Sequence, residues 1–297
     1  MTFSFYNWYG SWNTRYGSNC DDDITGNNCS ETFYGYGGND SIRAGGGEDT
    51  VYGGSGDDFI DGGYGNDRLY GGSGADFVVG GEGCDLVDGG SGADLLFGEN
   101  GNDVLYAGTG LDIVSGGDGD DALYAKDSCG TVVDSCYDGQ GFDYFDGGTG
   151  NDRLDATGSN VKLYGLGGEG CDVLVGGNNA DQLFGNENND VLRGGKGADS
   201  LYGGEGDDRF VFAHNAWCPS NSDFQSGVRD NIFDFGDHDR IQLQGLSSRN
   251  VSVCEQAEGT LITVCASGAG TGEIFVWGAN ACEVQQALDI TSCYYGV

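Results

Sequence analysis

The chain has 297 residues, of which 60 are glycine and one is proline, and its 48 acidic residues against 12 basic ones give a formal net charge of −36. A surface of this charge attracts cations and repels nucleic acid and anionic lipid, so nucleic acid is excluded as a partner. No apolar run reaches the roughly 20 residues of a membrane span, so none is predicted. The glycines also lack the three-residue period of collagen.

Residues 1–16 are crowded with aromatic side chains: Phe3, Phe5, Tyr6, Trp8, Tyr9, Trp12 and Tyr16. Aromatic faces suit the stacking of sugar rings, which is one interpretation of the segment. The other is a cap, because the terminal units of a repeat array need their open end covered. We predict an N-terminal aromatic cap over 1–16 and keep a sugar-binding platform as the alternative.

Residues 17–124 divide without a slip into nonapeptides, as in GGSGDDFIDGGYGNDRLYGGSGADFVV at 53–79. A typical one has glycine at its first, second and fourth positions. We call its sixth position the acid slot and its eighth the apolar slot. Every acid slot in this stretch is acidic: Asp22, Glu31, Asp40, Asp49, Asp58, Asp67, Asp76, Asp85, Asp94, Asp103, Asp112 and Asp121. Every apolar slot is apolar: Ile24, Phe33, Ile42, Val51, Ile60, Leu69, Val78, Val87, Leu96, Leu105, Val114 and Leu123.

An interruption at 125–137 separates this block from a second one at 138–211. Three nonapeptides at 138–164 have Asp143 and Asp152 in their acid slots, with Val161 in the third. Gly165 and Leu166 are extra, and five more nonapeptides follow. Their acid slots hold Asp172, Asp181, Asp190, Asp199 and Asp208.

This pattern predicts an all-β fold, a parallel β-roll. The residues around each apolar slot form a short strand with one side chain inward, and the glycine-rich turn reverses the chain. Two nonapeptides complete one coil, so turns two repeats apart stack on the same edge. Their carboxylates then face each other and repel by about 3 kcal/mol at 5 Å and an effective dielectric of 20. A divalent cation with oxygen ligands relieves this repulsion, and calcium tolerates carbonyl-rich sites better than magnesium.

The nonapeptides resemble the GGxGxDxUx repeats of the repeats-in-toxin (RTX) family of hemolysin-type calcium-binding proteins. The resemblance covers residues 17–211 and implies a calcium-loaded β-roll with roughly eleven ions. Repeats 17–25 and 26–34 lack paired glycines, so we expect weak calcium sites or none there. Val161 replaces an acid, so we also expect one calcium site to be lost at its turn. The predicted calcium ligands are Asp40, Asp49, Asp58, Asp67, Asp76, Asp85, Asp94, Asp103, Asp112, Asp121, Asp143, Asp152, Asp172, Asp181, Asp190, Asp199 and Asp208.

Residues 212–297 have a different composition and predict a small β-rich cap. Its strands carry alternating apolar residues: Ile232, Phe235, Ile241 and Leu243. The segment is similar to the region after the repeats of secreted RTX proteins, where Asp-Phe precedes D-x-I-x-L. That resemblance implies that it caps the roll and leads into a C-terminal signal for type I export. A cap without an export role is the alternative.

The sequence predicts no catalytic residues. His214 and His238 are the two histidines, and neither belongs to an HExxH zinc motif. A GxSxG nucleophile motif is also missing. We therefore predict a protein that is not an enzyme. Paired aspartates acting as acid and base on a glycan are the weakest alternative, because every candidate is already a repeat residue.

Eleven cysteines are unusual for the RTX family, and oxidised pairs would suit an extracellular protein. The odd count leaves at least one thiol free or bridged to another chain. Cys20 and Cys29 fall on opposite edges of a regular roll, which argues against their pairing. The candidate pairs are Cys129 with Cys136, Cys254 with Cys265, and Cys282 with Cys293. Cys84, Cys171 and Cys218 have no evident partner.

Together these features predict a secreted, extracellular calcium-binding protein that folds on calcium after leaving the cell through a type I exporter. Its role would be structural, or an interaction with an extracellular polysaccharide or a cell-surface partner. Two alternatives stay open. One is a polysaccharide-associated module resembling the non-catalytic repeats of alginate epimerases, and the other is an enzyme with an unrecognised site.

Overall fold

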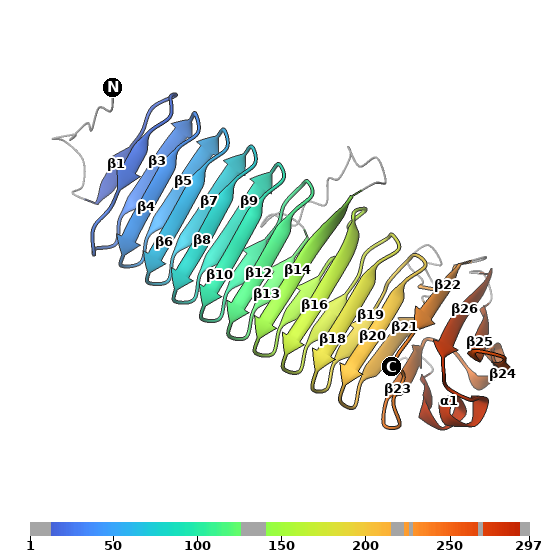
Figure 1. Ribbon diagram of the computed structural model, residues 1–297. Coiled ribbons are helices and arrows are strands. Elements are labelled where there is room, and N and C mark those ends of the chain that lie inside the picture. Colours follow the sequence, from blue (N-terminus) through green and yellow to red (C-terminus); the bar gives the residue numbers. More distant parts are fainter. Residues whose placement is uncertain (1–12, 126–140, 215–222, 226–227, 267–269, 292–297) are drawn as a thin grey trace, which may run out of the picture. The chain divides into compact units, whose positions relative to one another are not determined.

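The computed structural model describes residues 13–125, 141–214, 223–225, 228–266 and 270–291 (Figure 1). The aromatic residues up to Trp12, most of the interruption at 125–137, and Cys129, Cys136, Cys218 and Cys293 lie outside these ranges. The chain forms two compact units, residues 1–153 and 154–297. No helix in the described ranges is both long and apolar enough to cross a membrane.

The first unit is a parallel β-solenoid with two sheets whose strands alternate along the chain (Figure 1). One sheet contains, in order, β1 (Thr14–Tyr16), β3 (Thr32–Gly37), β5 (Thr50–Ser55), β7 (Arg68–Ser73), β9 (Leu86–Ser91), β11 (Val104–Tyr106) and β13 (Ala122–Tyr124). The other contains β2 (Asp23–Thr25), β4 (Ser41–Gly46), β6 (Phe59–Tyr64), β8 (Phe77–Glu82), β10 (Leu95–Asn100), β12 (Ile113–Asp118) and β14 (Phe142–Thr149).

The strand register confirms that two nonapeptides make one coil. Val51 lies beside Leu69 and Ile60 beside Val78, each pair 18 residues apart. Apolar slots therefore stack in two rows, and the side chains of Val51, Ile60, Leu69 and Val78 are fully buried. The core is one inward side chain wide on each sheet, as the predicted β-roll requires.

The second unit continues the same architecture. One of its sheets contains β15 (Arg153–Asp155), β17 (Val173–Val175), β19 (Val191–Arg193), β21 (Arg209–Ala213), β23 (Arg240–Gln244) and β27 (Leu288–Thr291). The other contains β16 (Lys162–Glu169), β18 (Gln182–Glu187), β20 (Ser200–Glu205), β22 (Arg229–Ile232), β26 (Gly270–Trp277), β25 (Gly259–Ala266) and β24 (Val251–Gln256).

Strands after residue 211 extend both sheets of this unit. Strand β22 pairs in parallel with β20, and β23 with β21. The pattern changes only at the antiparallel strands β24, β25 and β26, beside the 3-10 helix η2 (Ser248–Asn250) and helix α1 (Ala281–Ala287) (Figure 1). Helix α1 begins at Asn280, whose side chain caps the N–H groups of Cys282 and Glu283.

One register prediction was wrong. Strand β16 places Tyr164 beside Gln182 and Gly165 beside Leu183, so Leu163 occupies the acid slot that the sequence frame gave to Val161. The two extra residues lie before this strand, and not at Gly165 and Leu166, which are part of it. The loop before β16 contains the two extra residues, and Gly158 in this loop has a φ of 87°. The side chains of Val161 and Leu163 are both buried. Burying both apolar side chains stabilises this segment more than keeping the nine-residue spacing would.

The turns depend on glycine for two separate reasons. Gly54 and Gly56 have φ angles of 119° and 123°, a conformation that glycine adopts without cost. The turns also stack closely, since a Cβ built on Gly74 would lie 2.1 Å from the carbonyl oxygen of Gly56 in the preceding coil. A side chain at such a position must displace backbone.

We predict that Gly74→Ala lowers the free energy of unfolding by more than about 1 kcal/mol, because alanine is strained at its φ of 126° and its methyl group meets that carbonyl. The measurement is urea unfolding in excess calcium. Ala75→Ser changes the exposed neighbour and should leave the midpoint where it is. Equal midpoints for both variants would contradict the stacking argument.

Candidate metal centre

The acid slots stand just before the strands and form columns along the edges of each unit. In the first unit the backbone N–H of Asp40 donates to Oδ1 of Asp58 at 2.8 Å, and Asp58 donates to Asp76 in the same way. Where the interruption intervenes, Asp121 donates to Asp152, 31 residues ahead, at 2.7 Å. The columns are Asp22, Asp40, Asp58, Asp76, Asp94, Asp112 and Asp143 on one edge, and Glu31, Asp49, Asp67, Asp85, Asp103, Asp121 and Asp152 on the other.

The second unit has two columns of the same construction. One joins Asp172, Asp190 and Asp208, and the other joins Asp181 and Asp199. All seventeen aspartates predicted as ligands are described, and all are buried. Burial of this many carboxylates along one side of each turn is the central feature of the molecule.

Two members of these columns, Asp230 and Asp239, were not predicted as acid-slot residues. Asp199 donates its N–H to Oδ1 of Asp230 at 3.1 Å, and Asp208 donates to Asp239 at 2.9 Å. Both steps span 31 residues, as at the interruption. The available signal was the D-x-I spacing of Asp230 to Ile232 and of Asp239 to Ile241, which matches the acid and apolar slots. The segment with these two aspartates was assigned to the cap because no glycine-rich turn precedes either of them.

In most acid slots the first carboxylate oxygen is hydrogen-bonded and the second is not. The second oxygen is buried without a hydrogen-bond partner in Asp40, Asp49, Asp58, Asp67, Asp76, Asp85, Asp94, Asp103, Asp121, Asp190, Asp199 and Asp208. An unpaired carboxylate oxygen out of water costs free energy unless a cation or a donor satisfies it. These oxygens are thus the places where a bound cation would gain most.

Backbone carbonyls share the surroundings of these oxygens. A Cβ built on Gly53 would lie 2.5 Å from Oδ2 of Asp58 and 2.6 Å from the carbonyl oxygen of Gly71, in the next coil on the same edge. Within the described ranges no three histidine, cysteine or acidic side chains gather closely enough to hold a metal. A buried carboxylate oxygen and a backbone carbonyl oxygen, both close to Gly53, are ligands that calcium accepts.

Burial raises the pKa of these carboxyl groups. Removal from water is the largest cause, partly offset by the hydrogen bond from the preceding coil. The pKa rises from 3.8 to about 6 in Asp58 and Asp76, and to about 7 in Asp85, Asp121 and Asp190. Neighbouring carboxylates add to the rise, as Asp76 does for Asp58. Without a cation these carboxyl groups are therefore harder to ionise than exposed ones.

The other candidate groups do not assemble into a site. His214 is buried, and His238 is exposed with Nδ1 3.5 Å from Asp207. The proposed Cys254–Cys265 bridge is wrong, because the strand register sets Cys254 opposite Leu261 and Cys265 opposite Thr271, and both thiols are free. The offset of four residues between Leu261 and Cys265 is too long for a disulfide.

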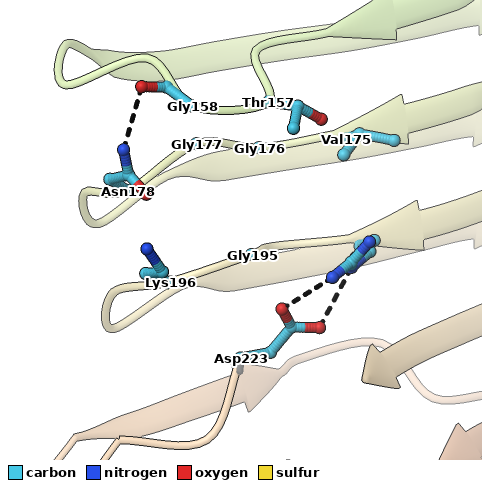
Figure 2. Close-up of a pocket in the computed structure, with 10 residues that line it drawn as sticks. Thr157, Gly158, Val175, Gly176, Gly177, Asn178, Gly195, Lys196 and Asp223 are labelled. Atoms are coloured by element: carbon cyan, nitrogen blue, oxygen red, sulfur yellow. Dashed lines mark hydrogen bonds and ion pairs between the residues drawn. The ribbon is translucent and has the colours of Figure 1, made fainter. Parts of the chain in front are cut away.

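A cavity of about 470 Å³ lies in the second unit, lined by residues 157–158 and 175–178 and by Arg193, Gly195, Lys196 and Asp223 (Figure 2). Its charged centre is an ion pair, in which Arg193 donates through Nε and Nη2 to both oxygens of Asp223 at 3.0 and 2.9 Å. Lys196 stands at the rim. This pairing already occupies the Asp223 carboxylate.

Comparison with known proteins agrees with the repeat pattern. The family model described as RTX calcium-binding nonapeptide repeat (4 copies) matches residues 25–60, 52–87, 61–96, 97–127, 134–163, 146–183, 164–192 and 184–212. These matches together cover more than half of the chain. No curated protein matches the chain.

The raised pKa values predict how the metal-free fold responds to pH. Below about pH 4 the carboxyls are protonated in both states, and between pH 4 and 7 the folded state binds more protons, so stability falls as pH rises. In chelator, β structure measured by circular dichroism should therefore increase as pH is lowered from 7.5 to 5. A signal that is flat or falls on acidification would contradict the burial of the columns.

Proposed function

Since the chain belongs to the family of RTX calcium-binding nonapeptide repeats, we propose that this calcium-binding protein is secreted and that uptake of calcium by its aspartate columns completes its folding outside the cell. The observation that carries the proposal is the row of buried carboxylate oxygens without hydrogen-bond partners along the turns. Calcium would supply the positive charge and the oxygen coordination that those turns lack.

The residues present fit calcium. Asp58 illustrates the donor set, with one oxygen held by the N–H of Asp40, the other unpaired, and the carbonyl oxygen of Gly71 near the unpaired one. We propose the acid-slot aspartates of such turns as ligands, together with turn carbonyls. Repulsion within each column then becomes attraction to a shared ion.

Calcium levels explain why folding would wait for export. Intracellular sensors are tuned to about 10⁻⁷–10⁻⁵ M calcium, and extracellular modules to about 10⁻⁴–10⁻³ M. Inside the cell the columns would stay charged and unbridged, and the thin core would not hold the solenoid together. An unfolded chain suits passage through a type I exporter, and residues after 211 would carry the export signal.

An interaction role is supported by a row of exposed apolar side chains in the first unit. Phe77, Leu95 and Ile113 lie side by side on β8, β10 and β12, with exposed fractions of 37, 36 and 44 %. Adjacent exposed apolar residues mark contact surfaces more often than single ones do. A rigid acidic solenoid with one apolar row fits a structural or surface protein that binds a partner.

The test of the proposal is a calcium titration of the full chain, followed by circular dichroism and sedimentation velocity. We expect an expanded chain with little β structure in chelator at pH 7.5, and a compact β-rich one in millimolar calcium. A chelated sample that is equally compact and equally rich in β structure would contradict the proposal.

A pair of variants locates the ligands. Asp58→Asn removes a buried carboxylate and should lower the number of bound calcium ions by at least one. It should also cost about 1.4 kcal/mol of stability at a calcium concentration tenfold above the dissociation constant. Asp57→Asn changes the exposed neighbour, whose Oδ1 accepts the N–H of Ala75, and should alter neither quantity. Equal calcium loss in both variants would mean that surface charge, and not the column, binds the ions.

A further inference from the structure

The repeat turns adopt two different conformations. In most of them the second and fourth residues both have positive φ, as Tyr36 and Gly38 do at 75° and 104°, and the second oxygen of the acid that follows is unpaired. We call these open turns. Three turns, 17–22, 26–31 and 176–181, have no positive φ at either position. We call these closed turns.

In a closed turn the acid folds back onto its own backbone. The N–H of Ser18 donates to Oδ2 of Asp22 at 2.6 Å, and that of Gly177 donates to Oδ2 of Asp181 at 2.7 Å. Asn27 and Glu31 do the same at 2.7 Å. The oxygen that is unpaired in an open turn is therefore already satisfied. A carboxylate that accepts several backbone N–H groups is stabilised in its charged form without a metal.

Side chains also link closed turns to the preceding coil, where in an open turn a bound ion would link neighbouring coils. The side-chain amide of Asn178 donates to the carbonyl oxygen of Gly158 in the preceding coil at 2.9 Å (Figure 2). The amide of Asn179 donates to the carbonyl oxygen of Asn160. At the closed turn 26–31, Asn13 donates to the carbonyl oxygen of Ser30 at 2.6 Å, and Arg15 forms an ion pair with Glu31 at 2.8 Å.

At two of the three closed turns, 26–31 and 176–181, the slot in the preceding coil holds no acid. Leu163 occupies the slot before Asp181 and donates its N–H to Oδ1 of that residue. Asn13 occupies the slot before Glu31, because its carbonyl oxygen accepts the N–H of Thr32, as that of Asp40 accepts the N–H of Phe59. At both turns the residue in the preceding slot therefore has no carboxylate that could share an ion with the closed turn.

We propose that Asp22, Glu31 and Asp181 bind no calcium and that their turns are metal-independent links, closed by backbone N–H groups and, at 26–31 and 176–181, by cross-coil amides as well. The inference rests on the proposed function, since it divides the acid slots into those that hold calcium and those that do not. It replaces the sequence-based assignment of Asp181 as a ligand. One edge of the second unit then has a break in its calcium column at 176–181.

The test counts calcium ions per chain, by native mass spectrometry of the full protein, in a matched pair of variants. Asp181→Asn should leave the count unchanged. Asp190→Asn alters the same slot one nonapeptide later, where the second oxygen is unpaired, and should lower the count by at least one. Circular dichroism in excess calcium verifies that both variants are folded.

A second pair makes the result independent of any local unfolding in the second unit. Glu31→Gln should keep the calcium count and Asp49→Asn, its neighbour in the same column, should lower it. Loss of an ion on changing Asp181 or Glu31 overturns the inference while the proposed function stands. An unchanged count in all four variants overturns the proposed function itself.

Discussion

The structure depends on how buried carboxylates of equal charge are kept one coil apart. Each backbone N–H in an acid slot donates to the carboxylate of the next coil, so one oxygen of almost every acid is used to hold coils in register. The second oxygen is left facing its own turn. The hydrogen bond to the first oxygen does not compensate for the loss of hydration of the charged carboxylate, so the pKa of these groups is raised. A cation that serves two coils removes both the desolvation penalty and the repulsion.

The rest of the fold contributes little packing between side chains. One inward side chain per nonapeptide gives a narrow core, and glycine turns contribute no side-chain packing. Under the proposed function, bound ions add the stabilisation that this narrow core lacks, and folding would depend on the surrounding calcium concentration. Export and folding would then be separated by compartment without a dedicated switch. Aromatic stacks on the outer face, such as Tyr34, Tyr52 and Tyr70 at about 5 Å, add packing that needs no ion.

The register of the strands and most of the acid-slot residues were predictable because the repeat is periodic. The acid and apolar slots fix the 18-residue register, and the buried rows of Ile60 and Leu69 follow from it. Errors arose where the period fails. Val161 was placed in an acid slot because the frame was extended without regard to burial, and Leu163 occupies that slot instead. Asp230 and Asp239 were missed because they follow irregular turns, although their columns continue through them.

The state of a turn is the property that its residues alone do not determine. Asn179 and Asn188 occupy the same fourth position in successive nonapeptides, yet Asn188 has a φ of 74° and Asn179 lies outside the left-handed region. Their turns differ in the coil before them, since Asp172 precedes Asp190 on one edge and Leu163 precedes Asp181 on the other. At Asp190, with Asp172 in the slot before it, the turn is open, and at Asp181, with Leu163 there, the carboxylate accepts the N–H of Gly177. The inference above therefore relates the conformation of these turns to the residue that lies beside them in the preceding coil, which their own sequence does not reveal.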